Sequence, residues 1–347
     1  MHTPPNYWLK NESSQNFGDF LSEYLFERMF LPVGVADDEI RIIGSCIANF
    51  VVEDALRNGC KNIAFWGSGL RDANSLGDEN RSVSKILSVR GPLSRSNLRL
   101  GSHVPIGDPG LFIPALYRPN HIQNLQNVSL LVPHFHDRRS DDELRSISSC
   151  EVVLRPNIAN CTSAIERFLD CLISADFILC GSLHAAVVAA SYGKPFGFWD
   201  SGCIDVPFKW QDFAASLGID AQFFPSLKDA KKFYESSIRD DLIIPILWPM
   251  LAVAPYAVRP EVMAKVIQMD FDQHGDSALR VRPPNSTAPQ IVNHIRATLA
   301  AHQLQLTERD GQIANLSQAV AERDGQIANL SQAVTERDGQ IAHLTQA

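Results

Sequence analysis

The sequence predicts an α/β fold with two doubly wound domains that face each other across a cleft, followed by a C-terminal coiled-coil helix. Three observations support this prediction. From about residue 40, short apolar runs alternate with longer amphipathic stretches, which is typical of parallel α/β sheets. A polar segment with two prolines, residues 114–126, divides these runs into two sets. The C-terminal segment repeats itself at a spacing of 14 residues.

The apolar runs mark the expected strands, because most of them end at a turn-forming or charged residue. In the first half they cover residues 40–43, 62–66 and 86–89, and in the second half residues 128–132, 152–154, 177–180 and 196–199. We therefore expect an N-terminal α/β domain over residues 1–118 and a C-terminal α/β domain over residues 119–270. Residues 271–296, which include the Pro-rich stretch 280–289, are expected to form a linker.

Residues 297–347 are expected to form a heptad-repeat coiled coil. The motif that begins at Glu308 recurs from Glu322 and again from Glu336. Apolar residues then occupy the a and d positions, interrupted at d by arginines: Ile313, Leu316, Val320, Arg323, Ile327, Leu330, Val334, Arg337, Ile341 and Leu344. Such a helix favours a homo-oligomer or a docking role. The alternative is a duplicated, partly disordered tail without a role in chemistry.

Composition excludes several classes of function. The chain has 39 acidic and 31 basic side chains and a net charge of −8, which argues against a general nucleic-acid binder. The first residues lack a basic and then apolar secretory signal, and no apolar run approaches the ~20 residues of a membrane span. We expect a cytoplasmic protein with at most peripheral membrane contact.

Asp270-Phe271-Asp272 resembles a metal-binding D-x-D motif, but it borders the linker, and no metal is expected.

Cationic and hydrogen-bonding residues follow several of the expected strands. Arg90, His134, Arg155 and the segment 181–184 come directly after apolar runs. In open α/β sheets ligands bind beyond the carboxyl ends of the strands, so basic groups gathered there indicate an anionic ligand. Each residue taken alone has a simpler explanation as a salt-bridge or capping partner.

The most informative segment runs from Asp176 to Trp199. A buried strand leads into Gly181, Ser182 is a natural N-cap, and small residues continue a helix to Gly193. Free backbone N–H groups at Ser182 and Leu183 favour an anion by ~0.3–2 kcal/mol. His184 in the first turn would stand beside that anion, placed to donate or accept a proton. Near the N-terminus, Asn16 and Asp19 precede an expected helix over residues 20–30, where Asp19 is either an N-cap or a substrate contact.

These motifs, taken in order, resemble the polysaccharide pyruvyl transferases. The resemblance covers roughly residues 10–220 and is carried by Asn-Phe-Gly-Asp at 16–19, Gly-Ser-Gly at 67–69, Val-Arg-Gly-Pro-Leu-Ser at 89–94, Gly-Asp-Pro-Gly-Leu at 107–111, Gly-Ser-Leu-His at 181–184, Ser-Tyr-Gly-Lys-Pro at 191–195 and Phe-Lys-Trp-Gln-Asp-Phe at 208–213. It implies two Rossmann-like domains in a glycosyltransferase-B-like arrangement, with acceptor bound on the N-terminal side and donor on the C-terminal side. It also implies phosphoenolpyruvate as co-substrate, no further cofactor, and a free or lipid-linked saccharide as acceptor.

The resemblance further implies residue roles. His184 matches the motif histidine and is the expected general acid, a role worth ~10²–10⁴ in rate. Arg155 and His134 are the other expected catalytic residues, and the residues expected to bind substrate are Ser182, Leu183, Arg90, Asn16 and Asp19. Many relatives carry Arg two residues before the histidine and Gly after it, where this chain has Ser182 and Ala185. Arg155 is the expected replacement for that arginine.

Two other functions remain open at this stage. A nucleotide-sugar glycosyltransferase would share the fold, but it is expected to carry a pair of carboxylates after His184, one of them for the ribose hydroxyls. The nearest acids there are Asp200, Asp205 and Asp212, which weakens this alternative. A non-catalytic scaffold, with the coiled coil recruiting partners, is the third possibility.

Overall fold

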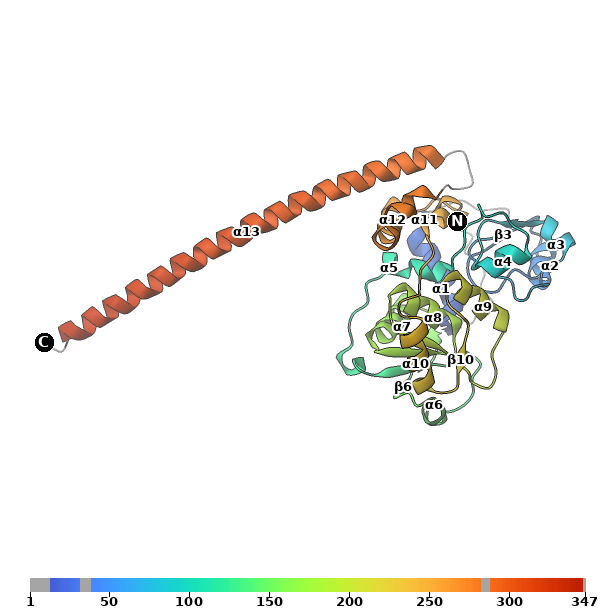
Figure 1. The fold of residues 1–347 in the computed structure, drawn as a ribbon, viewed down its shortest axis with the longest axis horizontal. Helices are drawn as coiled ribbons and strands as arrows, with labels where there is room; N and C mark the ends of the chain where they lie inside the picture. The colour runs from blue at the N-terminus through green and yellow to red at the C-terminus, as the bar shows by residue number, and fades with distance from the viewer. Residues whose placement is uncertain (1–12, 32–38, 282–287, 346–347) are drawn as a thin grey trace. The chain divides into compact units, whose positions relative to one another are not determined.

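The computed structural model describes residues 13–31, 39–281 and 288–345 as a mixed α/β structure (Figure 1). It contains two parallel sheets, one of three strands and one of five, and a two-stranded antiparallel sheet. The described residues up to 288 form one compact unit, and those from 289 onward form a second. The second unit consists of helix α13 (Ala288–Thr345) and is described separately below.

The three-stranded sheet has the order β2-β3-β4, with β2 at Glu39–Arg41, β3 at Ile63–Phe65 and β4 at Ser84–Ile86. Parallel bridges at Ser68–Val89 and Val89–Ile106 continue the pairing beyond β4. Helices α2 (Asn49–Arg57) and α3 (Asp78–Ser82) connect these strands, and α4 (Pro92–Asn97) follows β4; all three lie around β3 in Figure 1. The first two expected strands therefore overlap β2 and β3, whereas β4 begins two residues before its expected run.

The five-stranded sheet has the order β10-β9-β8-β5-β6, and all neighbours are parallel. Its strands are β5 (Ser129–Val132), β6 (Val152–Val153), β8 (Phe177–Cys180), β9 (Phe196–Trp199) and β10 (Phe223–Phe224). The connecting helices are α6 (Asp141–Ser148), α7 (Thr162–Ser174), α8 (Leu183–Ser191) and α9 (Pro207–Ser216), and α10 (Leu227–Ser237) follows the last strand. The chain builds outward from β5 to β6, then crosses back to add β8 on the other side of β5. The topological switch point of this sheet therefore lies between β5 and β8.

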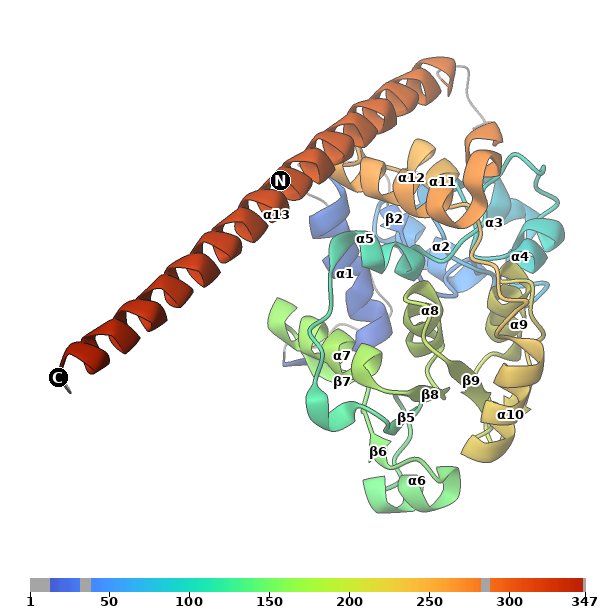
Figure 2. The same cartoon turned by 60° about the vertical axis from the view of Figure 1, so that its left-hand side comes forward.

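The N-terminal segment joins the second half of the chain rather than the first sheet. β1 (Ser14–Asn16) pairs antiparallel with β7 (Asn157–Ala159), and helix α1 (Phe17–Met29) follows at once. Phe17 stacks on Phe168 of α7 with ring centroids 4.1 Å apart, and Figure 2 shows α1 alongside α7 and α8. The expected helix over residues 20–30 thus begins three residues earlier. Its N-cap is Asn16, so the interpretation of Asp19 as the N-cap is wrong.

The chain after β10 returns to the first sheet. Helices α11 (Trp248–Ala252) and α12 (Pro260–His274) and the 3-10 helix η3 (Gly275–Arg280) pack near α5 (Ile113–Leu116). The indole N–H of Trp66, directly after β3, donates to the Met250 carbonyl at 2.8 Å. The contacts of α1 and α11 cross the expected boundary between residues 118 and 119, and the two-domain division remains a prediction.

The expected linker, residues 271–296, is helical at all described positions except Val281, which is extended. Residues 271–274 belong to α12, 275–280 form η3, and residues from 288 onward belong to α13; residues 282–287 lie outside the described residues. Short connections elsewhere are the 3-10 helices η1 (Pro109–Phe112) and η2 (Gln123–Leu125).

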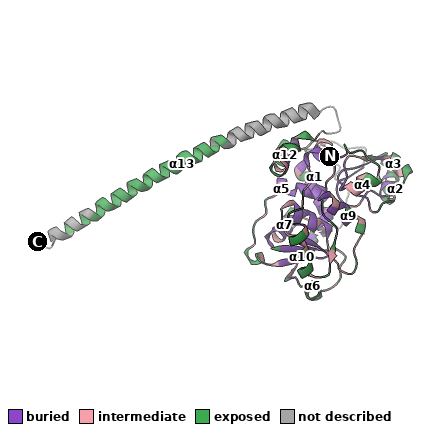
Figure 3. Ribbon diagram, viewed as in Figure 1, coloured by how far each residue is buried: buried purple, intermediate pink, exposed green. Residues whose placement is uncertain are grey.

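Helix α13 exposes every described apolar residue of its heptad pattern. The exposed fractions range from 56% to 66% for Ile313, Leu316, Val320, Ile327, Leu330, Val334 and Ile341. Figure 3 shows the same contrast, with buried residues concentrated in the first unit and the described residues of α13 exposed. The heptad helix is present, and its assembly into a coiled coil remains a prediction. Within the described parts of the chain, no helix combines the length and the apolar character needed to cross a bilayer.

Candidate functional site

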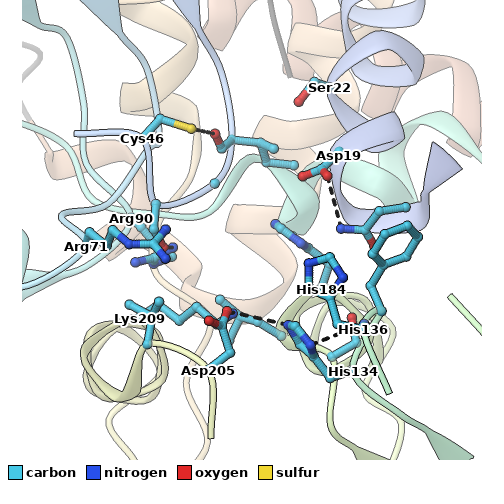
Figure 4. A pocket seen from close by; sticks show the side chains of 18 residues that line it. Asp19, Ser22, Cys46, Arg71, Arg90, His134, His136, His184, Asp205 and Lys209 are labelled. Carbon is cyan, nitrogen blue, oxygen red and sulfur yellow. Dashed lines mark hydrogen bonds and ion pairs between the residues drawn. The ribbon is translucent and has the colours of Figure 1, made fainter. Parts of the chain in front are cut away.

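One pocket lies at the carboxyl ends of strands from both parallel sheets. It is lined from the first sheet by residues after β2 and β4, from the second sheet by residues after β5 and β8, and from outside both sheets by the start of α1 and α9 (Figure 4). Because β5 and β8 flank the switch point of the five-stranded sheet, the pocket occupies the position where open α/β sheets bind ligands. Seven of the eight predicted site residues line it: Asn16, Asp19, Arg90, His134, Ser182, Leu183 and His184.

The start of helix α8 forms one wall of the pocket. Ser182 is its N-cap residue in extended conformation, but its side chain makes no capping hydrogen bond. The first backbone N–H groups of α8 therefore lack the hydroxyl partner that a serine N-cap usually supplies. Together with the positive end of the helix dipole, they favour an anion at this wall.

His184 is almost enclosed at the same wall. A Cβ added at Gly18 would lie 2.1 Å from its Nδ1, so only a glycine lets α1 approach the imidazole. Its Nε2 lies 4.0 Å from Oδ2 of the buried Asp108. Burial, followed by the positive charges of Arg90 and Lys209, lowers the pKa of His184 to about 3. The imidazole is therefore neutral at pH 7 in the ligand-free structure.

Asn16 and Asp19 reach the pocket from the first turn of α1. The pairing of β1 with β7 brings this turn to α8, and the Phe17 N–H donates to the Pro156 carbonyl at 2.7 Å. Asn16 Nδ2 donates to Asp19 Oδ2 at 3.1 Å. Burial raises the pKa of Asp19 to about 6, against the opposing effect of that hydrogen bond. Asp19 is thus a carboxyl group that changes charge close to neutral pH.

Arg90 supplies a fixed positive charge from the first sheet. Its side chain is fully buried, its Nη1 donates to Ser45 Oγ at 3.1 Å, and its Nε lies 3.7 Å from Oδ2 of the buried Asp212. A Cβ at Gly69 would lie 2.2 Å from Arg90 Nη2, which explains why the loop after β3 is glycine-rich. A buried arginine held by one carboxylate retains donors for an anionic ligand.

The pocket is also lined by two cationic residues that the sequence did not predict as site residues. Arg71 follows the Gly-Ser-Gly segment, and Lys209 lies in the first turn of α9; Figure 4 shows both on the side of the pocket facing His184. Lys209 Nζ contacts Asp205 Oδ2 at 2.5 Å, and burial lowers the lysine pKa. Lys209 belongs to a motif that carries the family resemblance, and Arg71 lies two residues after another. This closeness to the motifs is the sequence signal that could have identified both residues as pocket residues.

His134 stands beside these cations. Its Nε2 lies 3.5 Å from Oδ2 of Asp205, the same oxygen that contacts Lys209. The hydrogen bond with His134, followed by the charge of Lys209, lowers the pKa of Asp205 despite its partial burial. Asp205 is therefore ionised at neutral pH and connects the loop after β5 to α9.

Arg155 does not line the pocket, which corrects the expectation that it replaces the motif arginine at Ser182. Its guanidinium is used within the second half of the chain: Nε donates to Asp141 Oδ1 at 2.8 Å, and Nη1 donates to the Asp137 carbonyl at 2.9 Å. The reason is strand order, because Arg155 follows β6 at the edge of the sheet, whereas the pocket forms beyond β5 and β8.

The D-x-D segment is not part of this site. Asp270 is buried and its carboxylate accepts hydrogen bonds from the backbone N–H groups of Leu247 and Trp248, at 2.7–3.0 Å. Asp272 accepts from Gln268. Asp270 therefore holds the start of α11. Over the described residues, the structure shows no group of three His, Cys, Asp or Glu side chains placed to hold a metal ion.

The pocket thus combines binding groups for an anion with groups that exchange protons. Arg71, Arg90 and Lys209 supply positive charge, and the start of α8 supplies backbone N–H donors. His184 and Asp19 supply titratable groups within the same pocket. Such a site suits a small, multiply charged anion that reacts through proton transfer.

Comparisons with known proteins point to one family. The family model described as polysaccharide pyruvyl transferase matches residues 16–198, more than half of the chain. This range begins at Asn16, the last residue of β1, ends within β9, and includes Asp108 and His184. No curated protein and no solved structure matches the chain.

Proposed function

Because the chain belongs to the polysaccharide pyruvyl transferase family, we propose that it forms a pyruvate ketal on a sugar of an exopolysaccharide or cell-surface glycan. Phosphoenolpyruvate is the proposed donor and co-substrate. One observation carries this proposal: three cations and the start of α8 surround His184 in a single pocket. The phosphate and the carboxylate of phosphoenolpyruvate are the anionic groups that such a pocket would bind.

The cations of the pocket would hold the donor. Arg71, Arg90 and Lys209 stand in for the motif arginine that is Ser182 in this chain. Charge-assisted hydrogen bonds of this kind contribute ~1.5–3 kcal/mol each. The backbone N–H groups at Ser182 and Leu183 would bind a further oxygen of the donor. Because these groups lie on opposite walls, the donor would be fixed at both of its charged ends.

His184 is the proposed general acid. Binding of the anionic donor offsets the charges of Arg90 and Lys209, so the pKa of His184 rises and the imidazole takes up a proton. The imidazolium then protonates the methylene carbon of the donor, and the electron pair of the carbon–carbon double bond forms the new C–H bond. One sugar hydroxyl adds to the central carbon, which has become electrophilic. Phosphate leaves with its C–O electron pair, and a second hydroxyl closes the ketal.

Asn16 and Asp19 are the proposed contacts for the acceptor. Both come from the first turn of α1, and Asp19 has a pKa of about 6. A carboxylate with this pKa is suited to accept the proton that a sugar hydroxyl releases during addition. A free or lipid-linked saccharide would bind here from the cytoplasm, with at most peripheral membrane contact.

Self-association through α13 is part of the same proposal. The described a and d residues form an exposed apolar stripe along a helix of 58 residues. A stripe of heptad spacing is buried most simply by a second copy of the same helix, because every a and d residue then meets its own counterpart. The chain would thus act as a homo-oligomer.

The activity test measures phosphate release from phosphoenolpyruvate in the presence of free or lipid-linked galactosides, mannosides and glucosides. We expect release with at least one acceptor, and a product heavier than the acceptor by the pyruvate ketal. His184→Gln should lower the rate of release ~10²–10⁴-fold while retaining the wild-type thermal unfolding midpoint to within a few degrees. Consumption of a nucleotide sugar without phosphate release from phosphoenolpyruvate would instead establish a glycosyltransferase. Absence of both would favour the scaffold.

A further inference from the structure

Two enclosed polar atoms face each other at the back of the pocket. Asp108 is the N-cap of η1, and its Oδ1 accepts from the Gly110 N–H at 2.9 Å. Its Oδ2 is buried without a hydrogen-bond partner among the described residues, and the same holds for Nε2 of His184. These two atoms are 4.0 Å apart, which is about one ångström longer than a hydrogen bond.

The capping role of Asp108 does not account for its second oxygen. An N-cap needs one acceptor, and asparagine or serine would serve equally well. Burying a carboxylate oxygen without a partner is unfavourable, and buried polar groups in native proteins are normally hydrogen-bonded. The structure places the equally enclosed Nε2 of His184 opposite Oδ2, and the charge of Arg90 also acts on this carboxyl group.

We propose, resting on the function proposed above, that Asp108 is a positioning residue for His184. Its Oδ2 accepts a hydrogen bond from Nε2–H and thereby fixes the tautomer of the imidazole. Nδ1 is then the atom that carries the transferable proton. It lies beside Gly18, in the same turn of α1 from which Asn16 and Asp19 line the pocket. The 4.0 Å gap closes to a hydrogen bond when the donor binds.

The charges around His184 explain why the pair closes only then. Positive groups face it from two elements and negative or titratable groups from the others: Arg90 after β4, Lys209 on α9, Asp108 on η1, Asp19 on α1, and His134 and Asp205 in the adjoining loops. Arg90 and Lys209 oppose protonation of the imidazole, and burial acts in the same direction. A bound anion screens both cations, which leaves Asp108 as the dominant charge near Nε2.

The first test observes the tautomer directly. In ¹⁵N-labelled full-length protein, the His184 signals are assigned by their loss in His184→Gln. Inorganic phosphate is used as the anion, and the spectra are recorded at a pH above the pKa of the bound state, where the imidazole is neutral and has a tautomer. We expect the Nε2–H tautomer in the wild type. Asp108→Asn should switch it to Nδ1–H, because the amide keeps an oxygen for Gly110 and offers its NH₂ to Nε2. Asp205→Asn, which removes a carboxylate from the same pocket, should leave the Nε2–H tautomer in place. An Nδ1–H tautomer in the wild type, or the same tautomer in Asp108→Asn, would overturn the proposal.

The second test separates positioning from a structural role. Asp108→Asn should lower kcat about 10²–10⁴-fold, with KM for phosphoenolpyruvate unchanged or lower because a negative charge is removed. The loss of activity with rising pH should begin at lower pH than in the wild type, since the imidazolium loses its counter-charge. In a His184→Gln background the same substitution should have no further effect on the residual rate. A raised KM with additive losses would assign Asp108 a structural role only.

The two proposals fail in distinguishable ways. If phosphoenolpyruvate releases no phosphate with any acceptor but Asp108→Asn still reverses the His184 tautomer, the pair is real and the proposed activity is wrong. If the activity is present and the tautomer does not respond to Asp108→Asn, the pairing is wrong and the proposed function stands.

Discussion

At the scale of single residues, the site depends on close approaches that only particular side chains allow. Gly18 lets α1 reach the imidazole of His184, and Gly69 makes room for the guanidinium of Arg90. Both glycines belong to segments that the sequence marked as motifs, but the residues that they accommodate lie elsewhere in the chain. The need for glycine in these motifs is therefore explained by the side chains that pack against them from distant parts of the chain.

Gly18→Ala tests this packing. The added Cβ would lie 2.1 Å from Nδ1 of His184, so the imidazole must move. We expect kcat for phosphate release to fall roughly 10–100-fold, because a displacement of about one ångström is costly for proton transfer. Gly77→Ala is the matched control, since its Cβ would meet Asn49 at an ordinary 3.7 Å. Steady-state kinetics of both variants, at equal thermal stability, check the prediction; equal rates would contradict it.

Lys209→Met tests the cationic wall. The substitution keeps an unbranched apolar stem of similar length and removes the charge, while Asp205 keeps His134 as a partner. We expect the dissociation constant for phosphoenolpyruvate to rise about 10–150-fold, the equivalent of one charge-assisted hydrogen bond of ~1.5–3 kcal/mol. Isothermal titration calorimetry measures this change. Lys194→Met, at a half-buried lysine after α8 that does not line the pocket, should leave the affinity unchanged.

At the scale of elements, strand order decides which strand-end residues meet. His134 and His184 follow β5 and β8, which are neighbours in the sheet, so both line the pocket. Arg155 follows β6 at the edge and instead binds Asp141. All three residues follow a short apolar run in the sequence, and their local patterns are alike. Local pattern predicts that a residue ends a strand but not which strand lies beside it.

Helix α13 has a heptad pattern that predicts opposite effects of two substitutions. Ile327→Asp places a charge on the exposed apolar stripe and should shift the full chain toward monomer in sedimentation velocity experiments. Arg323→Leu removes one of the two interruptions of the d series and should tighten association, because a charged residue in the seam reduces stability. Arg323 has no acidic residue three or four positions away in its own helix. A monomeric wild-type chain at all concentrations would contradict self-association.

A control on the outer face of α13 separates helix propensity from association. Gly325 falls at heptad position f, and a Cβ there meets nothing within 4 Å. Gly325→Ala should therefore add about 1 kcal/mol of helix stability per chain without altering the seam. Circular dichroism should show a higher melting temperature for the tail, with the same stoichiometry as the wild type.

At the scale of the whole molecule, the first and last segments of the first unit each pack against the half of that unit that is distant in sequence. In the N-terminal segment, β1 pairs with β7 in the two-stranded sheet and α1 packs against α7 and α8. The segment after Leu247 returns to Trp66 beside the three-stranded sheet. The pocket is thus enclosed by three separated parts of the first unit, at residues 16–22, 43–90 and 134–209. Stability and chemistry of the pocket are coupled, because the buried titratable groups proposed to transfer protons also make the stability of the fold depend on pH.

His184→Asn tests that coupling through pH. The pKa of His184 is about 3 in the folded chain, below the ~6.5 of an unfolded histidine. As the pH falls through 6.5 the unfolded chain takes up a proton that the folded chain does not, so stability falls. From pH 8 to pH 5 the wild type should lose ~2 kcal/mol relative to the variant.

Urea unfolding at the two pH values measures this difference. Asp19 and Asp108 gain stability as the pH falls, because their folded pKa values of about 6 are raised, but they are present in both proteins and largely cancel. His103→Asn, at an exposed histidine, is the control and should follow the wild type. An equal pH dependence of wild type and His184→Asn would contradict the prediction.

The sequence by itself determined the α/β class, most of the strand positions and the heptad helix. Of the eight site residues that it predicted, seven line the pocket. The sequence determined these features because apolar periodicity, glycine turns and motif order are local properties that a single chain displays directly. Only the tertiary structure decided that Arg155 lies outside the pocket, that Arg71 and Lys209 lie in it, and that Asp108 faces His184. These outcomes depend on strand order and on the crossing of α1, which are set by burial of apolar surface among segments far apart in the chain.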